Sequence, residues 1–335
     1  VYSPNFYGAF LPEDAPTAYG IIGGDFLAVA SAGGAGWRIT RYVSVGANVS
    51  YNYMRLTIAQ KISLANSLTP AGQDPAGLAA AAQLLIGDLK LDYDGTEHGV
   101  GWTAGVLVTP LPWLNIGVAY AGNTSPAFEG EVKFSAYNER LADEQDFRDV
   151  VSSVGYKLPS ALVIEQPIPH ALFFGAMVSL GPQVELGVDA RFWFYNAFST
   201  QTIRPIYDPD EAGTEPLTEE SLSKDKQYKL SWQVTGGVLV RPIASYPRLE
   251  LMAGGGYDQS PIPDQTLTLD NPNMSHAKLT LGVRWRPGDS WSVAATYLLN
   301  VYTPRDIRDS QTSPPTNVQI SSHSHSPALS LGYRF

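Results

Sequence analysis

Serine and histidine are neighbours at two places in this sequence, and such pairs could support nucleophilic chemistry. Ser275 precedes His276, and Ser324 stands between His323 and His325. A hydrolase needs a serine hydroxyl, a histidine base and an orienting acid or amide in one geometry, which adjacency in sequence does not provide. His323 and His325 would share one face of a strand and could contact a surface metal ion. We favour solvated histidines at the ends of loops.

Composition and charge exclude other classes of function. The 335 residues include 32 Asp or Glu and 22 Lys or Arg, a net charge of −10. Because acidic residues outnumber basic ones, we expect no basic surface that could bind nucleic acid. Cysteine is absent, which excludes disulfides and thiolate metal sites. No apolar stretch reaches the roughly 18 residues that a membrane-spanning helix needs.

Apolar and polar residues alternate with a period of two over most of the chain. In 43–53, valines and tyrosines oppose serine, glycine and asparagine; 184–194 and 279–286 alternate in the same way. The last ten residues, SPALSLGYRF, place Leu, Leu, Tyr and Phe on one face and small or polar residues on the other. This is the periodicity of β-strands, sustained beyond the ordinary strand length of about 5–6 residues.

The connections between these segments alternate between short and long. A membrane β-barrel has this arrangement, with short turns at the periplasmic end and long loops outside. Because every backbone group in lipid must be paired, the sheet must close with its apolar face outward. The short links lie near 40–42, 110–112, 181–183, 242–247 and 287–289, and the long ones near 64–88, 139–156, 207–226, 260–274 and 304–318.

The predicted fold is therefore an all-β, antiparallel transmembrane β-barrel of the outer-membrane type. The alternative is a soluble β-sandwich or jelly roll, but a dry core tolerates charges such as Glu185, Asp189 and Arg284 badly. Aromatic residues near strand ends fit interfacial girdles. We predict a partial strand at 1–10 and complete strands at 18–39, 42–62, 88–109, 113–137, 157–180, 184–205, 227–241, 246–259, 274–286, 290–303 and 319–335.

Three stretches resemble a known family. GGGYDQSPIPDQTLTLDNPN (254–273) and the hairpin GWTAGVLVTPLPWLNIGVAYAG (101–122), with the terminal LSLGYRF, are similar to the FadL-type outer-membrane transporters of long-chain fatty acids and other hydrophobic compounds. The segment YDQSPIPD is the most specific match. The resemblance extends strand by strand over the chain, while the loops diverge.

The resemblance implies a fourteen-stranded barrel with an N-terminal hatch in its lumen, an outer groove for substrate and a lateral exit. About twelve of these strands have counterparts here, but the hatch, its Asn-Pro-Ala motif and the first two strands do not. We therefore expect residues 1–335 to be one barrel domain and a fragment, with an open seam between its first and last strands. A naturally shortened barrel is the alternative.

Two long loops are candidates for the family's capture groove. In 67–88, Pro75 can open a helix, and Leu78, Ala82 and Leu85 then share one helical stripe. The resemblance implies that the next long loop contributes the second half of the groove. An acyl chain gains about 0.8 kcal/mol per buried CH₂, so a modest apolar groove could bind one. The alternative is that the loops pack on each other. The residues of the second loop are Phe147, Val151 and Val154.

A fatty-acid carboxylate would require a cation, and Lys226 and Arg191 are the candidates. Lys226 would lie at the outer end of a strand, and Arg191 would face the lumen near Asp189. Pairing with lumen acids, such as an internal Asp189–Arg191 pair, is the simpler interpretation of these cations. Neither a metal nor a cofactor is expected.

The predicted function is uptake of long-chain fatty acids or similar hydrophobic compounds across the outer membrane of a Gram-negative bacterium, without enzymatic activity. The expected partners are a hydrophobic small molecule, outer-membrane lipid and lipopolysaccharide, and the expected state is a monomer. The alternatives are an aromatic hydrocarbon transporter of the same family, an outer-membrane lipid hydrolase or a general porin.

Overall fold

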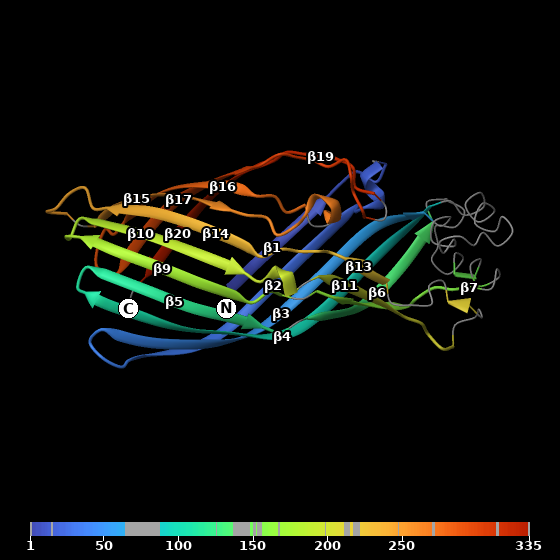
Figure 1. The fold of residues 1–335 in the computed structure, drawn as a ribbon, viewed down its shortest axis with the longest axis horizontal. Coiled ribbons are helices and arrows are strands. Elements are labelled where there is room, and N and C mark those ends of the chain that lie inside the picture. The colour runs from blue at the N-terminus through green and yellow to red at the C-terminus, as the bar shows by residue number, and fades with distance from the viewer. Residues whose placement is uncertain are drawn as a thin grey trace.

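A computed structural model describes residues 2–14, 16–63, 88–124, 126–136, 148–149, 152, 156–166, 168–197, 199–210, 215–216, 222–246, 248–269, 272–312 and 315–333. Sixteen strand segments form one curved sheet, which curls into an incomplete barrel (Figure 1). The segments are β1 (Tyr2–Phe10), β2 (Gly23–Arg38), β3 (Val43–Ser63), β4 (Asp88–Leu111), β5 (Leu114–Asn123), β6 (Ala127–Ala136), β8 (Ala161–Glu165), β9 (Ala171–Leu180), β10 (Val184–Trp193), β11 (Thr200–Ile206), β13 (Leu222–Asp225), β14 (Ser231–Val240), β15 (Leu249–Asp258), β16 (His276–Trp285), β17 (Trp291–Tyr302) and β20 (His323–Tyr333).

The sheet is an antiparallel meander. Four pairs of segments, β5 with β6, β8 with β9, β10 with β11 and β13 with β14, each continue one pass of the chain, so the sixteen segments make twelve passes. This confirms the predicted barrel strands and their number. Two small sheets accompany the wall: β7 (Tyr156–Lys157) with β12 (Glu215–Pro216), and β18 (Arg305–Asp306) with β19 (Gln319–Ile320).

Three predicted strands are interrupted and a fourth begins later than predicted, which corrects the sequence interpretation. The ranges 113–137, 157–180 and 184–205 each contain two segments of the main sheet. Pro126 and Pro169 lie in the first two interruptions and have no N–H to donate to a ladder. The third is the short 3₁₀ turn η3 (Tyr195–Ala197). The strand predicted from 227 starts at Ser231, because Gln227 adopts a left-handed conformation with φ of 47°.

The short connections and the long ones lie at opposite ends of the barrel. The links that follow β2, β4, β9, β14 and β16 gather at the left of Figure 1, and we call this the turn end. The described parts of the longer connections after β15 and β17 lie at the other end, the loop end. The described part of the last strand, β20, pairs with β17, and β1 pairs with β2, while no pairing joins β1 to β20 among the described residues. This is the predicted open seam.

Alternation along the strands separates an inner face from an outer face. Val188 and Leu281 on the outer face are each 52% exposed, whereas Glu250 on the inner face is fully buried. A soluble sandwich would bury the valine and leucine instead. Among the described residues, no helix has the length and apolar character that crossing a membrane requires.

The polarity of both faces reverses about halfway along the barrel. On β4 the outer face carries Trp102 and Val100 near the turn end, but Asp94 and Asp92 near the loop end. The inner face changes in the opposite sense, because Tyr93 and Leu89 are buried while the inner positions from 99 to 105, nearer the turn end, are glycine and threonine. The turn half is thus apolar outside, and the loop half is apolar inside.

Candidate functional site

The loop half of the barrel encloses a large apolar cluster on the inner faces of adjacent strands. Phe128 of β6 is fully buried, its ring meets Phe26 of β2 edge-on at 6.1 Å, and its backbone oxygen accepts a 2.8 Å hydrogen bond from the Tyr93 hydroxyl. We call this cluster the outer core. Its buried members are Ala28, Met54, Leu89, Tyr93, Phe128, Val132, Phe134, Ala136, Leu158, Leu162 and Ile164.

A second apolar cluster lies where the segments after β13 and β15 meet the segment after β17. It consists of Tyr228, Ile262, Leu267 and Ile307, and we call it the loop cluster. Partly buried Tyr195 packs against it, and burial raises the pKa of the Tyr195 hydroxyl above its usual value, so this phenol stays neutral at physiological pH.

Two cations belong to this region. Arg305 is tied to the 260–274 segment by hydrogen bonds to Asp264 (2.6 Å), to the Asn273 oxygen (3.0 Å) and to the Ile262 oxygen (2.8 Å). Lys226 is only 4% exposed, and its Nζ lies 3.4 Å from the Thr268 hydroxyl oxygen. The segment also holds the Lys226 backbone, because the Thr266 hydroxyl donates to the Lys226 oxygen at 2.6 Å. A buried ammonium thus lies beside apolar side chains at the loop end.

The turn half contains a hollow of about 860 Å³ on the inner face of β2, β3, β4, β5, β9 and β10. Glycines form much of its wall, so we call it the glycine hollow. Arg191 and Asp189 line it, with Arg191 Nε 3.3 Å from Asp189 Oδ1. The Thr235 hydroxyl donates to the other Asp189 oxygen at 2.6 Å, and the Arg191 guanidinium lies 5.9 Å from the Phe173 ring centre. The predicted Asp189–Arg191 pair is confirmed.

Glycines shape the wall of the hollow in two different ways. At Gly105 a Cβ would meet the Ala119 Cβ at 3.0 Å, so glycine allows the strands to approach closely there. At Gly117 and Gly175 the nearest atoms to such a Cβ are 3.7 Å and 3.9 Å away, so a side chain would fit and would project into the free volume. The absence of side chains at these two positions keeps the hollow open.

Comparison with known proteins identifies the family. A family model described as "Outer membrane protein transport protein (OMPP1/FadL/TodX)" matches residues 26–335. The chain belongs to this family. It is therefore an outer-membrane β-barrel protein of the FadL/TodX type, from a family of Gram-negative outer-membrane transporters of hydrophobic compounds.

Solved structures of similar fold include three bacterial proteins. A FadL homologue from Pseudomonas aeruginosa has a TM-score of 0.81 at 14% identity, over 99% of this chain and 73% of that one. The toluene transporter TodX from P. putida gives 0.63 at 14% identity, over 94% and 72%. The toluene transporter TbuX from Ralstonia pickettii gives 0.59 at 16% identity, over 93% and 69%. At these identities the likeness establishes the barrel fold alone. No curated protein matches the chain.

The structure of this FadL/TodX-family protein covers two of the eight predicted ligand-binding residues. Lys226 lies beside the loop cluster and Arg191 lines the glycine hollow, so the two cations belong to different levels of the barrel. The predicted groove residues Leu78, Ala82, Leu85, Phe147, Val151 and Val154 fall outside the described residues. The groove therefore stays a prediction.

The outer core was missed by the sequence interpretation, although the sequence carries a signal for it. On β3 the apolar positions are odd from Val43 to Tyr53, whereas Met54, Leu56 and Ile58 are even. On β4 Leu89, Leu91 and Tyr93 are odd, while Val100, Trp102, Val106 and Val108, nearer the turn end, are even. A change of phase within one strand means that the apolar side chains move to the opposite face.

The serine and histidine neighbours do not form a nucleophilic site. His323 and His325 lie on the outer face of β20, whereas Ser324 lies on the inner face, where Asn300 donates to it at 3.0 Å. His276 Nδ1 is 3.1 Å from the Met274 oxygen, and the Ser275 hydroxyl oxygen accepts the Ser260 N–H at 3.0 Å. In the described residues, no group of three or more His, Asp or Glu could hold a metal ion.

Proposed function

We propose that this FadL/TodX-family protein takes up long-chain fatty acids or similar hydrophobic compounds by binding and diffusion, as a single-domain monomer and without covalent catalysis. A hydrophobic solute neither crosses a lipopolysaccharide leaflet readily nor persists in a water-filled pore. It needs an apolar surface that is continuous from the outside to the lumen.

The reversal of wall polarity carries this proposal. In a general porin the inner face is polar, whereas the inner face of the loop half here is apolar, with the partly buried Phe26, Leu56 and Leu91 packed on the buried outer core. Each CH₂ that leaves water contributes about 0.8 kcal/mol, so a chain of a dozen or more carbons would partition strongly into such an interior. The solute would pass the loop cluster and the outer core, reach the glycine hollow and leave through the wall by lateral diffusion.

Filling the hollow tests the proposal. Gly175→Phe would project a ring into the hollow without a backbone clash, since the nearest atoms to its Cβ are 3.9 Å away. Gly33→Phe is the matched control, because nothing lies within 4 Å of a Cβ at Gly33, and this position is on the outer face, paired with exposed Val49.

Uptake of labelled oleate and of labelled toluene would be measured in cells that express each form at equal surface level. We expect Gly175→Phe to reduce oleate uptake to a small fraction of the wild-type rate and Gly33→Phe to leave it unchanged. Toluene uptake without oleate uptake would assign the protein to aromatic hydrocarbons. Equal uptake in the two variants, or none above background in the wild type, would refute the proposal.

A further inference from the structure

Two histidines stand side by side on the outer face of β20. His323 and His325 are two residues apart on one strand, so their side chains leave it on the same side, and both residues are exposed. Their ring centres are 5.2 Å apart, and the two ring planes are nearly perpendicular at 83°. Ser324, which separates them in sequence, lies on the inner face. The outer face therefore presents two adjacent imidazole rings.

The separation of the two rings suits a metal ion held by both. Zinc binds an imidazole nitrogen at about 2.0–2.1 Å, so two such ligands at a tetrahedral angle have ring centres about 5 Å apart. The observed separation of 5.2 Å agrees with this value. Positions i and i+2 of a strand are themselves about 7 Å apart, so the two rings lean toward each other.

Tyr297 of β17 orients one of the two rings. Its hydroxyl is hydrogen-bonded to Nδ1 of His325, which leaves Nε2 as the nitrogen that can bind an ion. With a metal ion on Nε2 the proton of the imidazole resides on Nδ1, and the Tyr297 oxygen accepts it. Metal-bound histidines are generally held by an outer hydrogen bond of this kind. Among the described residues no hydrogen bond engages the ring of His323, so this ring can turn toward the same ion.

The two histidines lie at the outer edge of the lipid-facing band. His323 begins β20 and Tyr333 ends it at the turn end, while Leu329 and Leu331 between them are 86% and 69% exposed. At about 3.4 Å per residue and a tilt of about 40°, the ten steps from Tyr333 to His323 rise about 25 Å, which is the height of the apolar band of such barrels. The site is therefore accessible to an ion from the external solution.

We propose that His323 and His325 bind a divalent transition-metal ion, of the class that imidazole prefers: Zn²⁺, Cu²⁺ or Ni²⁺. Two protein ligands leave the other coordination positions to water, so this is an open, exchangeable site and not a closed structural one. Ca²⁺ and Mg²⁺ prefer oxygen ligands and should not compete. The proposal replaces the sequence interpretation of these histidines as solvated side chains, and it does not depend on the proposed uptake.

Metal titration of the whole purified protein tests the proposal. Binding of Cu²⁺ and of Zn²⁺ would be measured by calorimetry in phosphatidylcholine nanodiscs, for the wild type and for His323→Ala and His325→Ala. The matched control is His98→Ala. His98 also lies on the outer face, with its Nδ1 2.5 Å from the Tyr51 hydroxyl oxygen, but its ring contacts are with tyrosines and not with a second histidine in the described structure.

We expect the wild type to bind a single Cu²⁺ ion at micromolar concentration, with electron spin echo modulation from two imidazoles. Either substitution in the pair should weaken binding by at least about tenfold and leave the modulation of one imidazole, because loss of a ligand costs more than loss of its outer hydrogen bond. His98→Ala should bind as the wild type does. Millimolar Mg²⁺ should not displace the ion.

Tyr297→Phe tests the positioning role of the tyrosine and supplies a second readout if a histidine variant does not fold. It keeps both imidazoles and should weaken metal binding by about tenfold, whereas Tyr51→Phe should have no effect. The inference would be overturned if the wild type bound no ion, if binding were unchanged in both His323→Ala and His325→Ala, or if His98→Ala lost as much. Displacement by Mg²⁺ would also overturn it, because binding would then belong to oxygen ligands.

Discussion

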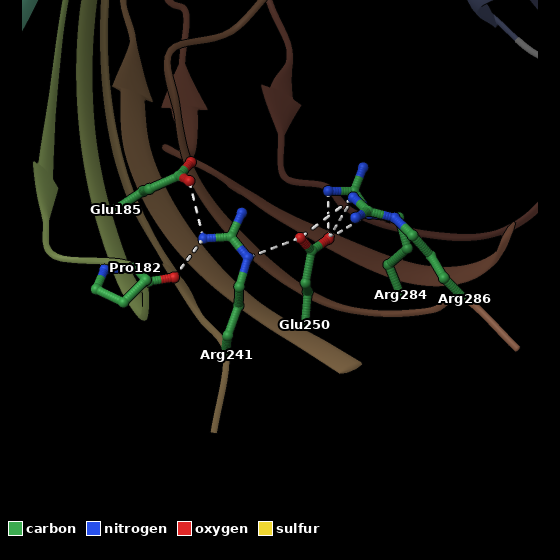
Figure 2. Close-up of polar contacts among 6 residues, drawn as sticks. All are labelled: Pro182, Glu185, Arg241, Glu250, Arg284 and Arg286. Atoms are coloured by element: carbon green, nitrogen blue, oxygen red, sulfur yellow. Dashed lines mark hydrogen bonds and ion pairs between the residues drawn. The ribbon is translucent and has the colours of Figure 1, made fainter. Parts of the chain in front are cut away.

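At the scale of single residues, Glu250 shows how a buried charge is accommodated in the barrel wall. Its carboxylate is removed from water but contacts three guanidinium groups that belong to the ends of β14 and β16 (Figure 2). Alternation in the sequence places Glu185, Glu250 and Arg284 on the inner face. The pairing itself could not be predicted, because it depends on the register between strands, which puts Glu250 directly opposite Arg284.

Removing this carboxylate should destabilise the protein substantially. Glu250→Gln would leave three close positive charges without their shared partner, and breaking a buried pair in this way costs about 3–5 kcal/mol. Glu185→Gln is the matched control, because the Glu185 side chain is 29% exposed and its only ion pair in the described structure is with Arg241. A partly exposed pair of this kind contributes about 1 kcal/mol or less. Urea unfolding in lipid vesicles would measure the difference, and equal midpoints would contradict the account.

At the scale of elements, the periodicity of two predicts the strands well where one uninterrupted segment forms the strand. The predicted 274–286 and 290–303 correspond to β16 and β17, which differ from them by two residues or fewer at each end. Interruptions were harder to predict, because Pro126 and Pro169 are also compatible with edges or bulges. To predict the outer core, one must know which half of each strand lies outside the lipid. Alternation identifies the two faces of a strand, but it does not show whether a face contacts lipid, water or protein.

The outer core should be the main source of stability in the loop half. Phe128→Ala would leave a cavity among β2, β4, β6 and β8, and we expect a cost of about 3–5 kcal/mol. Lys133→Ala on the same strand is the control, since Lys133 is exposed on the outer face and such changes stay within about 0.5 kcal/mol. Chemical unfolding of both variants measures the two effects. If Phe128→Ala lowered the free energy of unfolding as little as Lys133→Ala does, the outer core would not be packed in the folded protein.

At the scale of the whole molecule, one barrel wall serves two environments. The turn half presents residues such as Val188 to lipid and surrounds the glycine hollow, while the loop half presents Glu131 and Asp94 to water and surrounds the outer core. The reversal explains how a protein with a net charge of −10 can span a membrane and still offer an apolar interior to a hydrophobic solute.

The position of this reversal can be measured by spin labelling. The chain has no cysteine, so a single introduced cysteine carries the only label. In reconstituted vesicles, a nitroxide at Val188→Cys should be relaxed by oxygen and protected from a water-soluble nickel complex, and a nitroxide at Glu131→Cys should show the opposite. Nickel access at both outer-face positions, or oxygen preference at both, would contradict a wall whose outer surface changes from lipid-facing to water-facing halfway along.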